Sequence, residues 1–337
     1  MNWKLCGALI FAAALVWMGI ASSGHEPAQR AQWRELYRAD PIAHPDDNPY
    51  SNAKSELGRK LFFDPILSGS QLRSCASCHH PNLAWGDGLS RARGETTLAW
   101  RSPTLIGVGA MPRLGWDGKF RDLESVAFGP ITSPANMNLA EGELIRRLTS
   151  IPGYVDAFAK AFGEPGITRR KIELALATFE RTIEGEKTPF DHWIAGNERA
   201  ISEEAKRGFD IFNSKGRCSS CHSGHALSDG SFHDIGTAKG SDIGRGRLFP
   251  NSTPLRYAFK TPTLRDVARR APYMHDGSIA TLEEVIALYD RGGIDRPSRS
   301  KLIFPLGLTT DEKADLVAFL GMLTSPPVPF EMPHLPR

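Results

Sequence analysis

The sequence lacks the features that would indicate a nucleic-acid-binding or all-β protein. Its 337 residues carry 41 Lys and Arg against 38 Asp and Glu, a net charge of only +3. No basic run with interleaved aromatic residues occurs, so we expect no nucleic-acid partner. The alternation of apolar and polar residues that marks half-buried strands is scarce. Hydrophobic content is an ordinary 41%, and the length suggests about two domains.

Long hydrophobic runs are confined to the N-terminus. Lys4 precedes an apolar run from Leu5 to Ala21, and small residues follow it. This order predicts a secretory signal peptide at residues 1–23. A membrane anchor is the alternative, because the run is nearly long enough to span a bilayer. No second run of that length occurs, so we expect an exported protein with no stable membrane insertion after the signal is cleaved.

Cysteine is also sparse, with five residues in the chain, and Cys6 lies within the apolar run. The other four fall in "CASCH" at 75–79 and "CSSCH" at 218–222. C-x-x-C-H is the attachment signature of a c-type haem, in which both thiols bond the porphyrin and the histidine binds the iron. The signature therefore assigns two covalent haems to Cys75, Cys78, Cys218 and Cys221, with His79 and His222 as iron ligands.

Three other uses of these cysteines are possible. Four cysteines in an exported protein could form two disulfides. A zinc site would need four Cys or His ligands converging on one metal, which would leave part of each motif unused. A thioredoxin-like redox pair explains a C-x-x-C spacing. None of the three explains why a histidine follows both pairs.

The remaining pattern predicts a mainly α protein with two cytochrome c-like haem domains. Helices are expected at residues 54–62, 141–149, 152–162, 168–184, 202–213, 281–290 and 310–323. The long loops 86–116 and 223–262 need a reason inside a compact domain, and wrapping a haem is one. We expect an N-terminal extension at 24–50, a first haem domain at 51–192, a second at 193–325 and a tail at 326–337. The extension and the tail are polar or proline-rich and are expected to be extended.

The stretch "TLEEVIALYDRGG", residues 281–293, contains a tyrosine with two possible roles. Thr281 and Glu284 form a capping box that begins a helix. Tyr289 lies on its apolar stripe. On this pattern alone, Tyr289 is a core aromatic whose ring packs while its hydroxyl finds a partner.

Further motifs between residues 54 and 323 resemble one family. They are "LFFDPILSGSQ", "RSPTLIGV", "WDGKF", "FGPITSP" and "KTPTLRDVARRAPYMHDGS". Together with the haem motifs, they resemble the bacterial diheme cytochrome c peroxidase and MauG superfamily. The resemblance implies that the first haem meets peroxide, that the second stores oxidising equivalents, and that Trp116 relays electrons between them.

The resemblance gives Tyr289 a chemical role. Ordinary peroxidases of the family carry a methionine ligand at this place, whereas MauG-like enzymes carry a tyrosine. The resemblance thus implies Tyr289 as the second iron ligand opposite His222, with Met274 as its rival. Arg101 and Arg265 are candidates to pair with haem propionates, because a guanidinium fork suits a carboxylate, and surface ion pairs are the alternative. The loop "SRARGETTLAWR" has no histidine where many relatives use one, so we expect an open face on the first haem.

The sequence departs from the family in its peroxide pocket. A Gln and a Glu of the family correspond to Val126 and Asn136, whereas Pro130 of the pocket is retained. A carboxylate can move a proton between the peroxide oxygens, and an amide cannot. Glu141 and Glu143 are possible substitutes, although exposed surface charge is the simpler interpretation.

The resemblance also implies one calcium ion between the domains. Its protein ligands would be Ser102 and the carbonyls of Arg270 and Pro272. A serine hydroxyl is a weaker ligand than the amide it replaces, but carbonyls and waters can complete the shell.

These features together predict a periplasmic MauG-like diheme enzyme. It would use hydrogen peroxide to form a high-valent diheme state that oxidises a side chain of a partner protein. Similarity to the MbnH branch implies a tryptophan, converted to kynurenine, in a copper-binding partner. One alternative is a conventional peroxidase that takes electrons from a small cytochrome. Another is a non-catalytic two-haem electron carrier or peroxide sensor.

Overall fold

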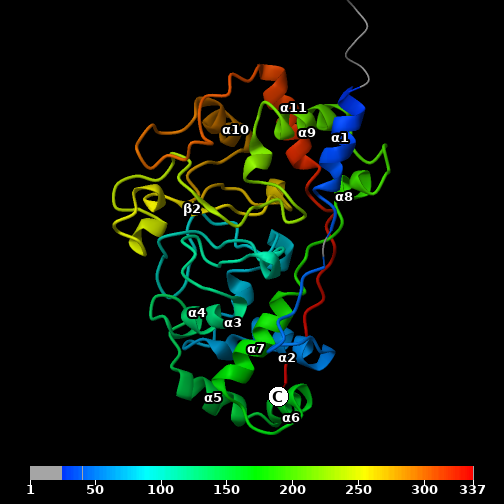
Figure 1. The fold of residues 1–337 in the computed structure, drawn as a ribbon. Helices are drawn as coiled ribbons and strands as arrows, with labels where there is room; N and C mark the ends of the chain where they lie inside the picture. Colours follow the sequence, from blue (N-terminus) through cyan, green and yellow to red (C-terminus); the bar gives the residue numbers. More distant parts are fainter. Residues whose placement is uncertain (1–24, 40, 337) are drawn as a thin grey trace, which may run out of the picture.

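The computed structural model describes residues 25–39 and 41–336, so the predicted signal peptide lies outside the described residues. Two helical halves lie one above the other (Figure 1). The lower half contains α2 (Asn52–Phe63), α3 (Leu123–Val126), α4 (Phe128–Thr132), α5 (Glu141–Thr149), α6 (Pro152–Phe162) and α7 (Arg169–Glu180). The upper half contains α1 (His25–Glu35), α8 (Pro189–Ile194), α9 (Glu203–Asn213), α10 (Leu282–Arg291) and α11 (Thr310–Gly321).

All seven predicted helices are present, and α5 and α6 have the predicted bounds. Four short or polar helices were not predicted, namely α1, α3, α4 and α8. The described residues contain one small sheet, in which β1 (Phe232–His233) pairs antiparallel with β2 (Phe259–Lys260). The mainly α prediction is therefore confirmed.

Each half is organised by the same helix crossing. In the lower half α2 crosses α7, and a Cβ at Gly58 would lie 2.0 Å from the Ala175 carbonyl oxygen and 2.8 Å from Cβ of Phe179. In the upper half α9 crosses α11, and a Cβ at Gly208 would lie 2.0 Å from the Asp315 carbonyl oxygen and 2.8 Å from Cβ of Phe319, the same distances as at Gly58. Only glycine permits so close a backbone approach. The two halves therefore share one framework.

Each half also has its own hydrophobic cluster. The lower cluster includes Phe62 of α2 and Phe158 of α6, both fully buried. The upper cluster includes Phe209 of α9 and Phe319 of α11. Helix α8 spans the predicted domain boundary at residue 192 and contributes Trp193 to the upper cluster.

The N-terminal extension is partly helical, which corrects the expectation that it is extended. Helix α1 packs on the upper half, where Trp33 lies edge-on to Phe209 at 6.3 Å. Tyr37, just beyond α1, contacts Phe190 at 5.6 Å and donates a hydrogen bond to Asn213. Because these contacts come from distant parts of the chain, the local sequence pattern does not reveal this helix.

The C-terminal tail leaves the upper half and ends on the lower half (Figure 1). Phe330 stacks on Phe63 with ring centres 4.9 Å apart. Arg59 of α2 donates a hydrogen bond to the Glu331 carbonyl. The tail is extended, as expected, and ties the two halves together.

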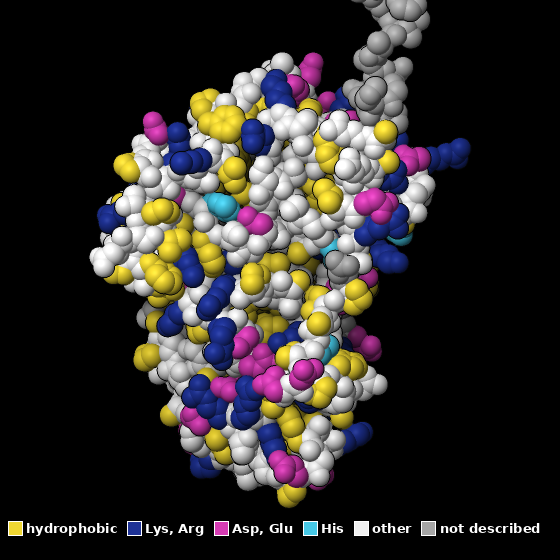
Figure 2. Space-filling view, viewed as in Figure 1, with side chains coloured by type: hydrophobic (Ala, Val, Ile, Leu, Met, Phe, Trp, Pro, Cys, Tyr) yellow, Lys and Arg dark blue, Asp and Glu magenta, His cyan; other side chains and the backbone are white. Residues whose placement is uncertain are grey.

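On the face shown in Figure 2, apolar side chains and Lys and Arg side chains are interspersed along the junction between the halves. Among the residues that the structure describes, no helix is both long and apolar enough to cross a membrane.

Candidate haem sites

The first C-x-x-C-H motif forms a tight turn that aims its histidine inward. Residues Cys75–Ser77 are one turn of 3₁₀ helix, and the His79 amide donates to the Cys75 carbonyl at 2.9 Å. The Nδ1 atom of His79 lies 3.3 Å from the Trp85 carbonyl oxygen. A carbonyl can only accept, so Nδ1 carries the proton and Nε2 is left as the metal-binding atom.

The second motif repeats this geometry. Residues Cys218–Ser220 form the turn, and the His222 amide donates to the Cys218 carbonyl at 2.9 Å. His222 Nδ1 lies 2.9 Å from the Leu227 carbonyl oxygen. Burial lowers the pKa of both His79 and His222. Both imidazoles are therefore neutral at neutral pH, the form that binds iron.

The four motif cysteines are free, which contradicts the two-disulfide alternative. Burial raises the pKa of Cys75, Cys78 and Cys218. Zinc binding needs thiolates, which such apolar surroundings disfavour. A thioether bond to a haem carries no charge and suits them.

A cavity in the upper half extends from the second motif to the junction with the lower half. Its walls include Cys218, Cys221 and His222 of the motif and Tyr289 of α10. The predicted stripe of α10 forms part of this wall, since Leu282, Val285, Ile286 and Tyr289 all line it. An apolar cavity that joins both thiols, an imidazole and a phenol fits a covalently bound haem.

Helix α10 places Tyr289 through local contacts that the sequence predicts. Thr281 and Glu284 form the expected capping box. The helix ends at Gly292, whose φ of 79° is left-handed. Burial raises the pKa of Tyr289, so its phenolate needs a cation beside it. The rival ligand, Met274, lines the same cavity from a loop, at a left-handed φ of 70°.

Trp116 lies where the two halves meet. Its indole nitrogen donates to the Arg101 carbonyl at 2.9 Å, and its own carbonyl accepts from Lys260 of β2 at 2.8 Å. It also lines the cavity that contains His222. Its ring lies edge-on to that of His275, with ring centres 6.4 Å apart. His275 is buried, and the sequence analysis did not identify it.

Two arginines line the same cavity. Arg101 is 8% exposed and Arg270 is half-buried, and burial lowers the pKa of both. Nε of Arg270 is buried and has no hydrogen-bond partner among the described residues. The guanidinium of Arg270 donates one hydrogen bond to the Thr263 carbonyl but pairs with no carboxylate among the described residues. A cation of this kind at a haem cavity suits a propionate. By contrast, Arg265, the other candidate for a propionate, is paired with both carboxylate oxygens of Asp191 at 3.0 Å.

Backbone hydrogen bonds link Asn136, one of the altered positions of the predicted peroxide pocket, to a loop that passes the first motif. The Asn136 carbonyl accepts from the Glu95 amide at 2.9 Å, and the Pro130 carbonyl accepts from the Met137 amide at 3.1 Å. The loop that contains Glu95 also passes the motif, because the Arg93 carbonyl lies 4.0 Å from Cys78 Sγ. Val126, the other altered position, packs against the lower hydrophobic cluster.

The two proposed substitutes for the missing carboxylate are committed to surface ion pairs. Glu143 pairs with Arg146 and Arg147, and these hydrogen bonds lower the pKa of Glu143 to about 2. Glu141 pairs with Arg169 at 3.1 Å. A carboxylate that stays ionised near neutral pH is a poor proton donor, so Glu143 does not fit the acid–base role.

The predicted calcium ligands lie at the junction. The buried Ser102 hydroxyl donates to Asp87 at 2.9 Å, so an anionic oxygen lies beside it. A cis peptide bond joins Ala271 to Pro272, directly after Arg270. Calcium binding here stays a prediction.

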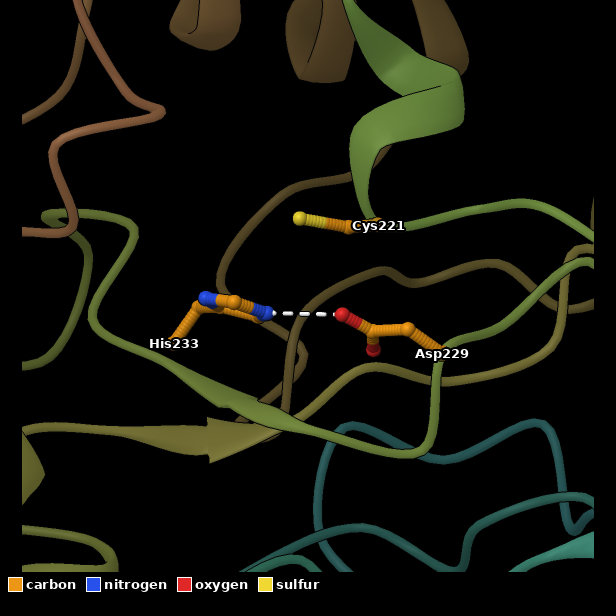
Figure 3. A group of neighbouring side chains, drawn as sticks. All are labelled: Cys221, Asp229 and His233. Atoms are coloured by element: carbon orange, nitrogen blue, oxygen red, sulfur yellow. Dashed lines mark hydrogen bonds and ion pairs between the residues drawn. The ribbon is translucent and has the colours of Figure 1, made fainter.

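A third group of possible metal ligands adjoins the second motif (Figure 3). Cys221, Asp229 and His233 lie within 4.8 Å of one another, and His233 Nε2 bonds to Asp229 at 2.9 Å. Asp229, followed by Cys221, raises the pKa of His233 to about 10. A metal at this group would need the Cys221 thiolate, which haem attachment consumes. We therefore interpret it as a haem link beside a His–Asp ion pair.

Comparison with known proteins agrees with this geometry. Residues 52–199 match the family model described as di-haem cytochrome c peroxidase, and residues 205–324 match that of cytochrome c. The methylamine utilization protein MauG of Methylorubrum extorquens is 44% identical over 320 residues, covering 94% of this chain and 90% of that protein. The cytochrome c551 peroxidase of Nitrosomonas europaea is 32% identical, with 86% and 85% covered.

A solved structure gives the same result. A MauG-like protein associated with microbial copper homeostasis superposes with a TM-score of 0.79 at 31% identity, covering 86% of this chain and 93% of that one. With both motifs, the shared helix crossing and these similarities in view, the chain belongs to the di-haem cytochrome c peroxidase and MauG family, and it is a haem oxidoreductase of the peroxidase class.

Proposed function

We propose that this diheme enzyme acts in the periplasm, where it uses hydrogen peroxide to oxidise a tryptophan of a partner protein without direct contact between that residue and a haem. The observation that carries the proposal is Tyr289, which faces the second haem cavity together with His222. A haem supplies the one-electron and oxygen chemistry that side chains lack. The residues of this chain decide which oxidising reactions it performs.

Tyr289 sets the character of the second site. A thioether ligand favours reduced iron and raises the potential of a haem. A phenolate is anionic and hard, so it favours the more oxidised states. Because burial raises the pKa of Tyr289, its proton leaves only when a metal cation replaces it. With Tyr289 as ligand, the second haem would be a poor electron donor and a good store of oxidising power.

The other residues divide the work. His79 would hold the first iron, and the loop opposite supplies no histidine to close its other face. His80 does not do so either, because it is exposed and its ring accepts from the Asn82 amide. Trp116 would pass electrons between the sites. Arg101 and Arg270 would hold propionates and fix the second haem against the junction.

Two observations bear on the partner. The solved relative at 31% identity is associated with copper homeostasis, which favours a copper-binding partner. Conversion of the partner's tryptophan to kynurenine is the part of the proposal that rests on the sequence resemblance to the MbnH branch. Relatives at 44% and 42% identity are named for methylamine utilization. Overall sequence identity therefore does not decide which branch of the family this enzyme belongs to. The chemistry of the partner protein decides it. A bound Ca²⁺ near Ser102 would stabilise the junction between the halves.

The test uses the protein with both haems, hydrogen peroxide and a periplasmic copper-binding protein from the same organism. Mass spectrometry of the partner should show oxygen added to one tryptophan, dependent on peroxide. Tyr289→Phe should lose this product, whereas Tyr50→Phe, a change at an exposed tyrosine, should not. Rapid multi-turnover oxidation of reduced cytochrome c in a stopped-flow experiment would instead show a conventional peroxidase. A protein that forms no persistent spectral state after peroxide addition would be a carrier or sensor.

A further inference from the structure

The duplicated helix crossing allows the two haem sites to be compared residue by residue. Phe179 of α7 and Phe319 of α11 occupy the same place, each with its Cβ 2.8 Å from the Cβ position of the crossing glycine. The next residues, Glu180 and Leu320, are therefore equivalent. Leu320 lines the second haem cavity. By this equivalence, Glu180 places a carboxyl group where the second site has an alkyl group.

The surroundings of Glu180 agree with this placement. It is 8% exposed, and its charge is the second largest influence, after burial, on the pKa of the Cys75 thiol. Its carboxyl group is thus close enough to Cys75 for its charge to act on that thiol. Among the described residues, no group donates a hydrogen bond to its side chain. Desolvation of this nearly buried carboxyl group is not offset by a hydrogen bond, so its neutral form is favoured over the carboxylate.

The charged groups that act on Glu180 already form hydrogen bonds or ion pairs with other residues. Arg181, the next residue, donates two hydrogen bonds to Glu124 of α3, at 2.7 and 2.9 Å. Lys54 of α2, which interacts electrostatically with Glu124, donates to the Asn48 side chain and the Pro49 carbonyl. Burial raises the pKa of Glu180 to about 8, with Arg181 opposing this and Glu124 adding to it.

We propose that Glu180 is the proton-exchanging residue of the first haem site, binding a proton when that haem gains an electron and releasing it when the electron leaves. The physical reason is electrostatic. An added electron makes the haem more negative, so a carboxylate beside it is disfavoured and a neutral acid is favoured. Leu320 gives the second haem no such group. The inference requires a haem at Cys75 and Cys78 and is independent of the partner.

This role matters because the family's acid–base residue is replaced by Asn136. Glu180 gives the first site one ionisable carboxyl group that can be neutral near neutral pH. It balances charge when the electron content of the site changes. Glu180 binds and releases a proton near the first haem site, and it need not contact peroxide.

The test is a reductive titration of the protein with both haems, followed by absorbance at several pH values between about 6 and 9. No peroxide or partner is present, so the result is separate from that for the proposed function. At fixed potential, the reduced-to-oxidised ratio of the first haem should fall by up to tenfold per pH unit, about 59 mV for one electron. Glu180→Gln should make this ratio nearly independent of pH.

Two variants keep the test decisive. Glu173→Gln removes a buried carboxyl group two turns earlier on α7 that pairs with Arg169, and it should behave as the unaltered protein. If Glu180→Gln fails to bind haem, Glu180→Leu, which copies the second site, provides the measurement. A difference infrared spectrum should also show a protonated carboxyl band that changes on reduction and is absent from the variant. An unaltered pH dependence in the Glu180 variants would overturn the proposal.

Discussion

The first and second haem sites are built on the same framework and differ in the side chains that the framework carries. Both use a glycine under a phenylalanine at the helix crossing, and both orient the motif histidine through a backbone carbonyl. The second site adds Tyr289 and Arg270 to its cavity. The first has Glu180 beside its helix crossing, and Asn136 stands where the family has a carboxylate. The shared framework explains haem binding, and the differing side chains explain why the two haems should react differently.

The largest expected effect is removal of one haem at a time. Replacing Cys75 and Cys78 with serine should leave one covalent haem and abolish the reaction with peroxide. Replacing Cys218 and Cys221 should also leave one haem, but peroxide should still react at the remaining site. Intact-protein mass spectrometry counts the haems, and stopped-flow absorbance follows peroxide. Equal loss of peroxide reactivity in both variants would contradict the division of roles.

A smaller effect is expected from the ion pairs that secure the crossing helices. Glu124 and Arg181 are 8% and 7% exposed at the side chain, so Glu124→Ala should leave a buried charge and cost about 3–5 kcal/mol. In the upper half Arg207 is 55% exposed against Asp315, and Arg207→Ala should cost about 1 kcal/mol or less. Denaturant unfolding followed by circular dichroism gives both values. Similar losses of unfolding free energy in the two variants would contradict the difference in burial between the two ion pairs.

The crossing glycines should respond alike. Gly58→Ala and Gly208→Ala each place a Cβ 2.0 Å from a carbonyl oxygen, and each should lower the free energy of unfolding by about 1–3 kcal/mol through overpacking. Gly142→Ala in α5 is the control, because a Cβ there meets nothing within 4 Å. A marked difference between Gly58 and Gly208 would argue against a shared framework.

The smallest expected effect concerns pH. Hydrogen bonds from Arg146 and Arg147 lower the pKa of Glu143 to about 2. Its folded-state pKa is depressed, so its interactions are lost only as the pH falls through that value. Glu143→Gln should therefore leave the pH profile of the peroxide reaction unchanged between about pH 5 and 9. A changed profile in this range would return Glu143 to the list of acid–base candidates.

The local patterns were sufficient to predict the helices and motifs with strong periodicity. The capping box at Thr281, the stop at Gly292 and the inward stripe through Tyr289 all appear as predicted. Helix α1 was missed because contacts such as that between Trp33 and Phe209 come from distant chain segments. Short helices such as α3 and α4 give too few residues for a period to be recognised.

The site residues likewise divide into those that local sequence predicts and those that depend on contacts between distant parts of the chain. The motif cysteines and histidines were identifiable from spacing alone. The positions of Arg270 and Glu180 were not, because each depends on how helices and loops from different parts of the chain meet. For Arg265 the sequence left a propionate and an ion pair as alternatives, and the structure pairs it with Asp191, 74 residues earlier in the chain.

The central claim is that Tyr289 distinguishes the second site by binding its iron. The most direct measurement is the electron paramagnetic resonance and absorbance spectrum of the oxidised Tyr289→Phe protein with both haems attached. Substitution should convert the low-spin signal of the second haem to high spin, because phenylalanine offers no ligand atom, and the first haem should keep its signal. An unchanged low-spin component would show that Tyr289 is not the ligand, and the same substitution at Met274 would then identify its rival.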